Sequence, residues 1–396
     1  MTTTPDVRVL TSSDGCRIYA DAVGDSSKPC LVFIHGFSLS AAVFDNIFFD
    51  ARYSSEFFLV RYDMRGHGRS GKPDTIDEYA SKLYADDFAA VLHTFKVRRP
   101  VVVTWSLGAT VTADIAAHLP QDTLAGIVYM APCPYIGLMP SIGTPFILNL
   151  LCDITSADDA TSADDNMQIF FNSCFTDAEK TPWETRALWQ GMSTFQRPRH
   201  RRFVVSRTQD PTRLLQLGTE GLPVLVLIGT KDPQIRTESL RTEMKKSFSN
   251  VDFYALEGAG HSIHYENKNE VMKRIMLFAK KTLTVRKKSD NICRVEKQPG
   301  SFLHLNVMAR VQICSSRALF GYNGTFAKLA LYEMDKCESR LLESIHGQPG
   351  SEERSPNTQY GPNLSLNRQS LRFESTISIF STSPKKVVDR LSERRT

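Results

Sequence analysis

The sequence lacks the patterns that identify several large classes of protein. Its eight cysteines are scattered, with neither a C-x-x-C pair nor the cysteine–histidine spacing of metal ligands, and we expect them to be reduced. The N-terminal residues lack the charged and then apolar segments of a secretory signal. No internal repeat and no heptad pattern is present. These absences predict a soluble, cytoplasmic protein that needs no metal ion and no other cofactor.

A long uncharged stretch, residues 124–152, is considered as a membrane span. A span needs about 20 consecutive apolar residues in one helix. Four prolines divide this stretch into short pieces, because proline interrupts the interior of a helix; they are Pro132, Pro134, Pro140 and Pro145. We therefore expect no membrane-spanning segment.

The positive charge is concentrated in the C-terminal part of the chain. The formal net charge is +5, but residues 284–396 alone carry 18 Lys and Arg against 11 Asp and Glu. The first 283 residues are slightly acidic, with 30 basic against 32 acidic side chains. Because a nucleic-acid surface needs a basic excess, no nucleic-acid partner is expected for this larger part.

Short apolar runs alternate with segments of helical periodicity through the first 283 residues. Short apolar or alternating runs predict strands at 7–10, 17–23, 30–34, 57–62, 101–103, 124–130, 224–228 and 251–256. Apolar residues at helical spacing predict helices at 41–49, 79–95, 108–117, 238–248 and 269–283. The alternation predicts an α/β fold with a mostly parallel, doubly wound sheet that helices cover on both sides.

Two segments depart from this alternation. Residues 133–222 are rich in aromatics and short helical patterns, at 146–151, 167–171 and 183–189, and are predicted to form a helical cap inserted after the sixth strand. Residues 284–396 show little periodicity and are dense in Ser, Pro, Asn, Gln and Gly between 347 and 367. We expect one domain over residues 1–283 and a largely disordered C-terminal extension over 284–396.

The segment around Ser106 organises these elements. Residues 101–103 read as a buried strand and residues 108–117 as a helix, so Ser106 falls in a sharp turn between them. Such a turn exposes a serine hydroxyl in the pattern G-x-S-x-G. Here the pattern reads Thr104-Trp105-Ser106-Leu107-Gly108, and a β-branched residue at Thr104 is expected to crowd the helix. The alternative is a serine in an ordinary strand–helix turn.

Two further side chains at strand ends match the needs of a nucleophilic serine. A serine hydroxyl needs a base at hydrogen-bond distance and a third group that orients the base. His261 follows the last strand in a glycine-rich loop and is the candidate base, and Asp232 follows the preceding strand as its partner. His264 is the competitor for the base, and Asp153 or Asp210 for the acid.

Other polar and aromatic residues near these strand ends are predicted to have structural roles, some with a functional alternative. His35, Asp63, Arg65 and His67 are predicted to form a polar cluster that fixes loops beside the site. Trp105 either lines a substrate pocket or packs beneath the cap. The basic run 197–202 is predicted to be a solvated face of the cap, with attraction of an anionic substrate as the alternative.

Four segments, in this order and at strand ends, resemble the α/β-hydrolase superfamily: HGF at 35–37, DMRGHGRS at 63–70, the SLG turn, and the GTKD and GAGH pair around Asp232 and His261. The resemblance covers about residues 5–283. Within the superfamily, the chain is similar in particular to cap-bearing esterases and cofactor-free haloperoxidases. It implies the α/β-hydrolase fold and the order Ser106, Asp232, His261. It further implies that the backbone amides of Phe37 and Leu107 hold the oxyanion.

Together these patterns predict a metal-independent serine hydrolase, foremost a carboxylic-ester hydrolase. Its partner would be a small to medium acyl substrate, an ester, a thioester or a related compound, and an acyl-enzyme would form on Ser106. Two alternatives stay open: perhydrolase or haloperoxidase-like activity of the same three residues, and a ligand-binding pseudo-hydrolase without turnover. The sequence leaves the oligomeric state and the identity of the substrate open.

Overall fold

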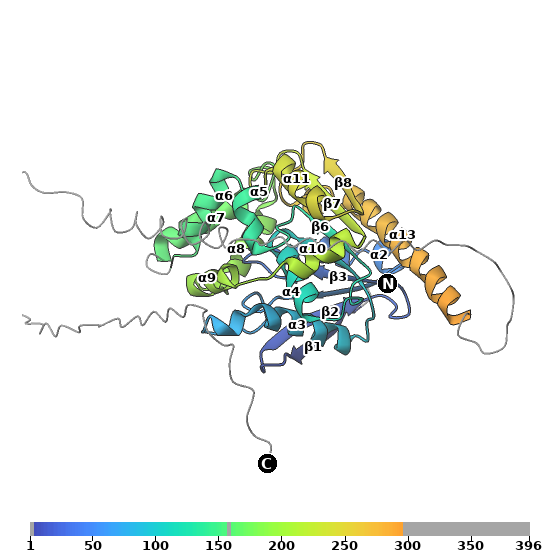
Figure 1. Cartoon of the computed structure of the whole chain (residues 1–396). Coiled ribbons are helices and arrows are strands. Elements are labelled where there is room, and N and C mark those ends of the chain that lie inside the picture. The colour runs from blue at the N-terminus through green and yellow to red at the C-terminus, as the bar shows by residue number, and fades with distance from the viewer. Residues whose placement is uncertain (1–3, 157–159, 296–396) are drawn as a thin grey trace, which may run out of the picture. The chain divides into compact units, whose positions relative to one another are not determined.

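The computed structural model describes residues 4–156 and 160–295 (Figure 1). For residue 160 and residues 284–295 it describes the backbone alone. Its centre is an eight-stranded sheet in the order β1-β2-β4-β3-β5-β6-β7-β8. The strands are β1 (Asp6–Thr11), β2 (Arg17–Val23), β3 (Cys30–Ile34), β4 (Phe58–Tyr62), β5 (Val101–Trp105), β6 (Gly126–Met130), β7 (Val224–Gly229) and β8 (Val251–Leu256). β2 pairs antiparallel with β1 and β4, and every other pair is parallel. The predicted mostly parallel sheet is confirmed.

Helices enclose the central strands. Every residue of β3, β4, β5, β6 and β7 is buried, as in strands that carry helices on both faces. The longer covering helices are α3 (Ser81–Thr94), α4 (Val111–His118), α11 (Thr237–Ser247) and α13 (Lys268–Val295). The shorter ones are η1 (Ala41–Phe44), α1 (Asp45–Phe48), α2 (Ala51–Ser54), η2 (Asp77–Tyr79), η3 (Ser106–Thr110) and α12 (Ile263–Glu266). None of the described helices is long and apolar enough to span a bilayer.

A run of helices separates β6 from β7. It contains η4 (Ile136–Leu138), α5 (Met139–Ile142), α6 (Pro145–Ile154), α7 (Ala160–Asn172), α8 (Trp183–Thr194), α9 (Pro198–Ser206) and α10 (Thr212–Thr219). We call residues 136–206 the helical insert; α6, α7, α8 and α9 lie together in Figure 1, and α7 contacts both α6 and α8. α10 instead contacts α4 and α11 beside the sheet. The place of the helices in the chain matches the predicted insertion after the sixth strand.

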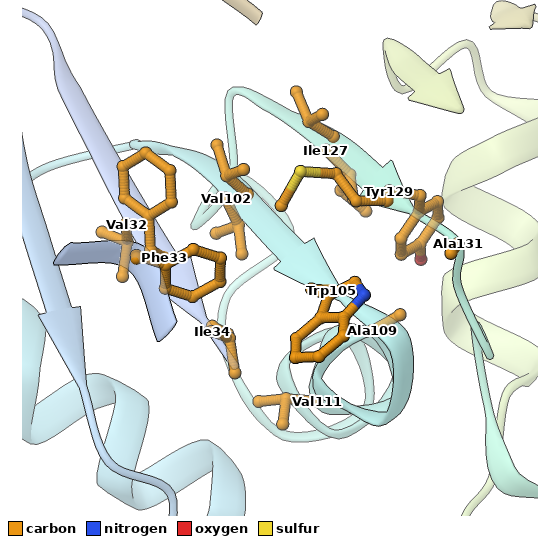
Figure 2. Close-up of a cluster of buried hydrophobic side chains, with 14 of the residues drawn as sticks. Val32, Phe33, Ile34, Val102, Trp105, Ala109, Val111, Ile127, Tyr129 and Ala131 are labelled. Atoms are coloured by element: carbon orange, nitrogen blue, oxygen red, sulfur yellow. The ribbon is translucent and has the colours of Figure 1, made fainter. Parts of the chain in front are cut away.

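The core beneath the predicted turn is built from three adjacent strands. Figure 2 shows apolar side chains of β3, β5 and β6 gathered against the start of α4. Phe33, Ile34, Val102 and Val111 have no exposed surface. Burial of one such side chain contributes about 1.5–3 kcal/mol, so the end of β5 is held by many favourable contacts. Ser106 therefore follows a rigid support.

Two expectations are corrected by the structure. The last helix does not end at Leu283, because α13 continues to Val295; the rest of the predicted extension lies outside the described residues. The basic run 197–202 is not a wholly solvated face, since His200 and Arg201 are 4% and 2% exposed. α9 is amphipathic, so it turns these two side chains inward while Arg197 and Arg202 remain exposed.

Candidate active site

Ser106 occupies a strained turn between β5 and η3. Its φ is +53°, in the left-handed region that side chains with a Cβ rarely adopt. A conformation of this kind costs of order 1–3 kcal/mol and is retained only where the surroundings hold it. The turn leaves Ser106 half-buried at the carboxyl end of β5. The predicted sharp turn is therefore present.

The two ends of the pattern at residues 104–108 have different structural roles. A Cβ at Gly108 would lie 2.4 Å from the carbonyl oxygen of His35 and 2.6 Å from that of Ile34. Only glycine allows this approach between the turn and the loop after β3. Thr104 is fully buried within β5, and its hydroxyl donates a hydrogen bond to the carbonyl oxygen of Val128 at 3.4 Å. A threonine at the first position thus packs into the core while the turn keeps its shape at Ser106.

Ser106, Asp232 and His261 meet in one hydrogen-bonded chain. His261 Nε2 lies 2.9 Å from Ser106 Oγ, and His261 Nδ1 lies 2.8 Å from Asp232 Oδ2. The side chains of His261 and Asp232 are 1% and 2% exposed. Because a carboxylate only accepts, Nδ1 carries the hydrogen and Nε2 is free to accept from the serine hydroxyl. The loops that follow β5, β7 and β8 bring together three residues that are far apart in the sequence.

Backbone groups hold Asp232 in place. Its Oδ1 accepts hydrogen bonds from the amides of Gln234 at 2.8 Å and Ile235 at 3.2 Å, which leaves Oδ2 for His261. The competitors Asp153 and Asp210 are both exposed, and Asp210 accepts from the amide of Thr212. Asp232 is thus the carboxylate that orients His261.

Trp105 packs in the interior, which is one of the two roles predicted for it. It is 1% exposed, and its ring lies 5.5 Å from that of Trp189 and 4.4 Å from that of His264. Its Nε1 donates a hydrogen bond to the carbonyl oxygen of His261 at 3.0 Å. The residue before Ser106 therefore fixes the backbone of the loop that carries the imidazole.

His264, the competing base, lies in an apolar environment. Its ring is fully buried between Trp105 and Trp189, with ring centroids 4.4 Å and 6.1 Å away. Neither ring nitrogen has a hydrogen-bond partner among the described residues. Burial lowers the pKa of His264 to about 3, so the ring is neutral at ordinary pH. His264 is a packing residue, and the hydrogen bond to Ser106 comes from His261.

The two amides that the resemblance implies for an oxyanion lie beside Ser106. Leu107 follows it directly, and Phe37 follows Gly36, where a Cβ would lie 3.3 Å from Ser106 Cβ. Within the described part of the chain, the Phe37 amide donates to no backbone carbonyl, and the Leu107 amide donates to none outside η3. Both N–H groups are thus left for another acceptor next to the serine hydroxyl.

The predicted polar cluster is confirmed as a device that fixes loops. His35 Nε2 accepts a hydrogen bond from the amide of Met64 at 3.0 Å, which ties the loop after β3 to the loop after β4. Asp63 accepts from the amides of Ala41 and Arg69, both at 2.8 Å. Burial raises the pKa of Asp63, but its hydrogen bonds and charge pairing with Arg69 outweigh this and lower it. Arg65 is buried in an ion pair with Asp87 at 2.7 Å.

Three contacts between the helical insert and the neighbourhood of Ser106 were not predicted. The ring of Phe170 in α7 lies 5.8 Å from that of Phe37. Met192 Sδ in α8 accepts from Ser40 Oγ at 2.9 Å, and Gln196 after α8 bonds to Ser38. In the sequence, only the aromatic content of this segment indicated that it contacts the site. A single glutamine belongs to no recognisable motif, so the contact of Gln196 could not be predicted. Among residues 4–156 and 160–295, no cluster of His, Cys, Asp and Glu is arranged to hold a metal ion.

Comparison with known proteins gives the family of this chain. The model of the alpha/beta hydrolase family matches residues 31–274, and the chain therefore belongs to this family. The chain is 35% identical over 120 residues to 2-(acetamidomethylene)succinate hydrolase of Mesorhizobium japonicum, which is 30% of this chain and 41% of that protein. It is 34% identical over 127 residues to the bifunctional esterase/perhydrolase DCH of Acinetobacter calcoaceticus, 32% of this chain and 44% of that protein. The chain thus spans less than half the length of these curated relatives.

Solved structures match over most of their length. A Burkholderia cenocepacia protein classed provisionally as an aryl esterase is 26% identical with a TM-score of 0.64, covering 70% of this chain and 99% of that one. Esterase RhEst1 from Rhodococcus sp. is 24% identical with a TM-score of 0.61, covering 69% of this chain and 98% of that one. The α/β-hydrolase fold is therefore established for this chain.

Proposed function

We propose that the chain is a metal-independent serine hydrolase that cleaves an ester, a thioester or a related acyl compound of small to medium size. The observation that carries the proposal is the chain of hydrogen bonds from Ser106 Oγ to His261 Nε2 and from His261 Nδ1 to Asp232, at 2.9 and 2.8 Å. Such a chain activates a serine hydroxyl, which is a poor nucleophile by itself. The hydrolases and esterases among its relatives support the same class of reaction.

The reaction follows from the placement of these groups. Ser106 Oγ attacks the acyl carbon while His261 Nε2 takes its proton, and the carbonyl oxygen becomes an oxyanion held by the amides of Phe37 and Leu107. Collapse of this intermediate breaks the bond to the leaving group, which receives the proton from His261. Water then gives a proton to His261 and attacks the acyl-enzyme, and the acid departs as Ser106 regains its hydrogen. Asp232 stabilises the imidazolium throughout.

The helical insert, residues 136–206, is proposed to form most of the predicted cap, which the sequence places at approximately 133–222. It supplies Phe170 against Phe37 and Met192 against Ser40, so apolar side chains approach the loop that would hold the oxyanion. Apolar surroundings of this kind favour an apolar acyl group. A panel of acyl esters of graded chain length, compared by kcat/KM, measures this preference.

A fluorophosphonate probe tests the nucleophile directly. It should label the wild-type protein at Ser106, and Ser106→Ala should abolish both labelling and ester hydrolysis. Ser26→Ala is the matched control, because Ser26 is an exposed serine before β3, in the segment that leads into the opposite end of that strand. Equal labelling of wild type and Ser106→Ala would refute the proposal. Ligand binding without labelling or turnover would favour the pseudo-hydrolase alternative.

A second activity has one specific observation in its favour. The Acinetobacter calcoaceticus relative is named for both esterase and perhydrolase activity. With hydrogen peroxide in place of water, the acyl-enzyme would give a peracid through the same three residues. Formation of peracetic acid from acetate and peroxide, lost in Ser106→Ala, is the measurement that separates this activity from simple hydrolysis.

A further inference from the structure

The loop after β3 contains a second strained residue. We call residues 35–40 the β3 loop; it includes Phe37, and Ser38 next to it has a φ of +57°. This left-handed conformation is unfavourable for a residue with a Cβ, so the loop needs an external contact to hold it. The direction of the Phe37 amide depends on the same backbone, because one peptide unit separates it from Ser38.

The contact comes from Gln196, which follows α8 in the helical insert. Ser38 Oγ donates a hydrogen bond to Gln196 Oε1 at 2.6 Å. Gln196 Nε2 donates to the carbonyl oxygen of Gly66 at 2.8 Å. Gly66 belongs to the loop after β4 and also has a positive φ, of +80°. One amide side chain therefore bridges two left-handed turns at the carboxyl ends of neighbouring strands.

We propose that Gln196 is a positioning residue that holds the β3 loop so that the Phe37 amide points at the oxyanion; the proposal rests on the hydrolase function proposed above. Ser38 and Gln196 are each 1% exposed, so water does not replace either hydrogen bond. A buried polar group left without its hydrogen-bond partner is unfavourable, which makes the bridged arrangement strongly preferred.

The chemistry of the bridge requires an amide. The Gly66 carbonyl only accepts, so it fixes the Gln196 NH2 group on its side and leaves Oε1 for the Ser38 hydroxyl. An ionised carboxylate keeps the shape and the acceptor for Ser38 but cannot donate to Gly66, so Gln196→Glu is assayed above the pH at which its carboxyl group ionises. Gln196→Glu therefore separates the hydrogen bond from the packing of the side chain.

Steady-state hydrolysis of an acyl ester tests the role. A misplaced oxyanion donor acts in the transition state, and loss of one donor costs about 10²–10³ in rate. We expect Gln196→Ala and Gln196→Glu to lower kcat by about 10–100-fold while KM changes by less than about 3-fold. Gln190→Ala is the matched control, because Gln190 is an exposed glutamine of α8, and its kinetics should be unchanged. If Gln196→Ala does not fold, Gln196→Glu carries the test.

A double substitution checks that the effect passes through Ser38. Ser38→Ala removes the hydroxyl that donates a hydrogen bond to Gln196 Oε1, so it should lower kcat in the wild-type background. In the Gln196→Ala background the same change should have little further effect, because the contact is already lost. Two losses that multiply would mean that the residues act separately, and the proposed route would be wrong.

Hydrogen exchange gives a readout that is independent of turnover. The amides of Ala41 and Val43 are hydrogen-bonded to Asp63 and Ser40 and report on the β3 loop. Their exchange should be at least about 10-fold faster in Gln196→Ala than in wild type or Gln190→Ala. Unchanged exchange would overturn the inference.

Different results would contradict the role of Gln196 and the hydrolase function. Full kcat in both Gln196 variants, with an active wild type, would overturn the role of Gln196 and leave the hydrolase intact. A wild type that neither reacts with the probe nor hydrolyses esters would overturn the function, and with it the assignment of Gln196 to the oxyanion.

Discussion

Two histidines three residues apart have opposite environments. His261 accepts and donates in the chain that links Ser106 to Asp232. His264 is enclosed by Trp105 and Trp189, and neither of its ring nitrogens has a partner in the part of the chain that the structure describes. The sequence GAGHSIH offers both as bases; the GAGH pattern favours His261 but does not say what surrounds either ring. The distinction lies in the surroundings of each ring, which only the folded chain supplies.

Replacing each histidine by phenylalanine turns this difference into a prediction. His261→Phe should lower kcat/KM by about 10³-fold or more, because the serine loses its base. His264→Phe should keep activity within about 3-fold, since phenylalanine preserves the aromatic packing and removes an unpaired polar ring. Ester hydrolysis by the two purified variants checks this, and comparable losses in both would contradict the assignment.

Buried neutral histidines predict a pH dependence of stability. Burial lowers the pKa of His35, His67 and His264, the last to about 3, against about 6.5 in an unfolded chain. Below about pH 6.5 the unfolded state binds protons that the folded state does not, so the free energy of unfolding falls as the pH decreases. For His264 the fall should approach about 1.4 kcal/mol per pH unit.

Denaturant unfolding at pH 7 and pH 5 measures this effect. His264→Phe should lose about 2 kcal/mol less than wild type between the two pH values, because one of the histidines with a lowered pKa is gone. Equal losses in the two proteins would mean that His264 is protonated in the folded state.

At the scale of elements, the turn after β5 depends on a close approach between backbones. A methyl group at Gly108 would meet the carbonyl oxygens of His35 and Ile34, which are backbone atoms and cannot rotate away. Gly191 in α8 is the contrasting glycine, because a Cβ there would meet no atom within 4 Å. An added methyl group would therefore clash at Gly108 and enter open space at Gly191.

Gly108→Ala should therefore displace Ser106 and lower kcat by about 10²-fold, since a shift of 1 Å in a reacting group has an effect of this size. Its free energy of unfolding should fall by about 1–3 kcal/mol. Gly191→Ala should keep activity and stabilise the protein by about 0.5–1 kcal/mol, as alanine favours a helix. Kinetics and thermal unfolding of both variants test the contrast.

The sheet was predictable from the sequence because its strands carry a strong local signal. The runs at 30–34, 101–103 and 224–228 are short, apolar and β-branched, and each is followed by a loop that contains a polar residue. The meeting of Ser106, Asp232 and His261 followed from the rule that parallel strands end at one edge. The contacts of Gln196 had no such signal, because they join segments more than 125 residues apart through one side chain.

At the scale of the whole molecule, the family match and the buried core end close together. The match ends at residue 274, and the buried apolar residues of α13 are Val271, Met272, Ile275, Phe278 and Ala279. The helix itself continues to Val295. Among the side chains that the structure describes in α13, those of residues 268–283, the last buried apolar one is Ala279.

A chain ending at Leu283 should keep the fold and the activity. Because the residues that pack α13 onto β6 and β7 remain, we expect kcat/KM within about 2-fold of the full chain and a similar unfolding midpoint. Size-exclusion chromatography, thermal unfolding and ester hydrolysis of both chains are the measurements. Loss of folding or of all activity would show that residues 284–396 are needed.

The helical insert supplies none of the three residues that would carry out the chemistry. Ser106, Asp232 and His261 all follow strands of the sheet, and the hydrogen bond from Trp105 Nε1 to the His261 carbonyl oxygen joins two of these strand ends. Evolution can therefore remodel the insert to accept new acyl groups while the reaction itself is inherited unchanged. Gln196 is the residue of the insert that we propose to support the reaction. In descendants of this chain with altered specificity, it should be substituted less often than its neighbours.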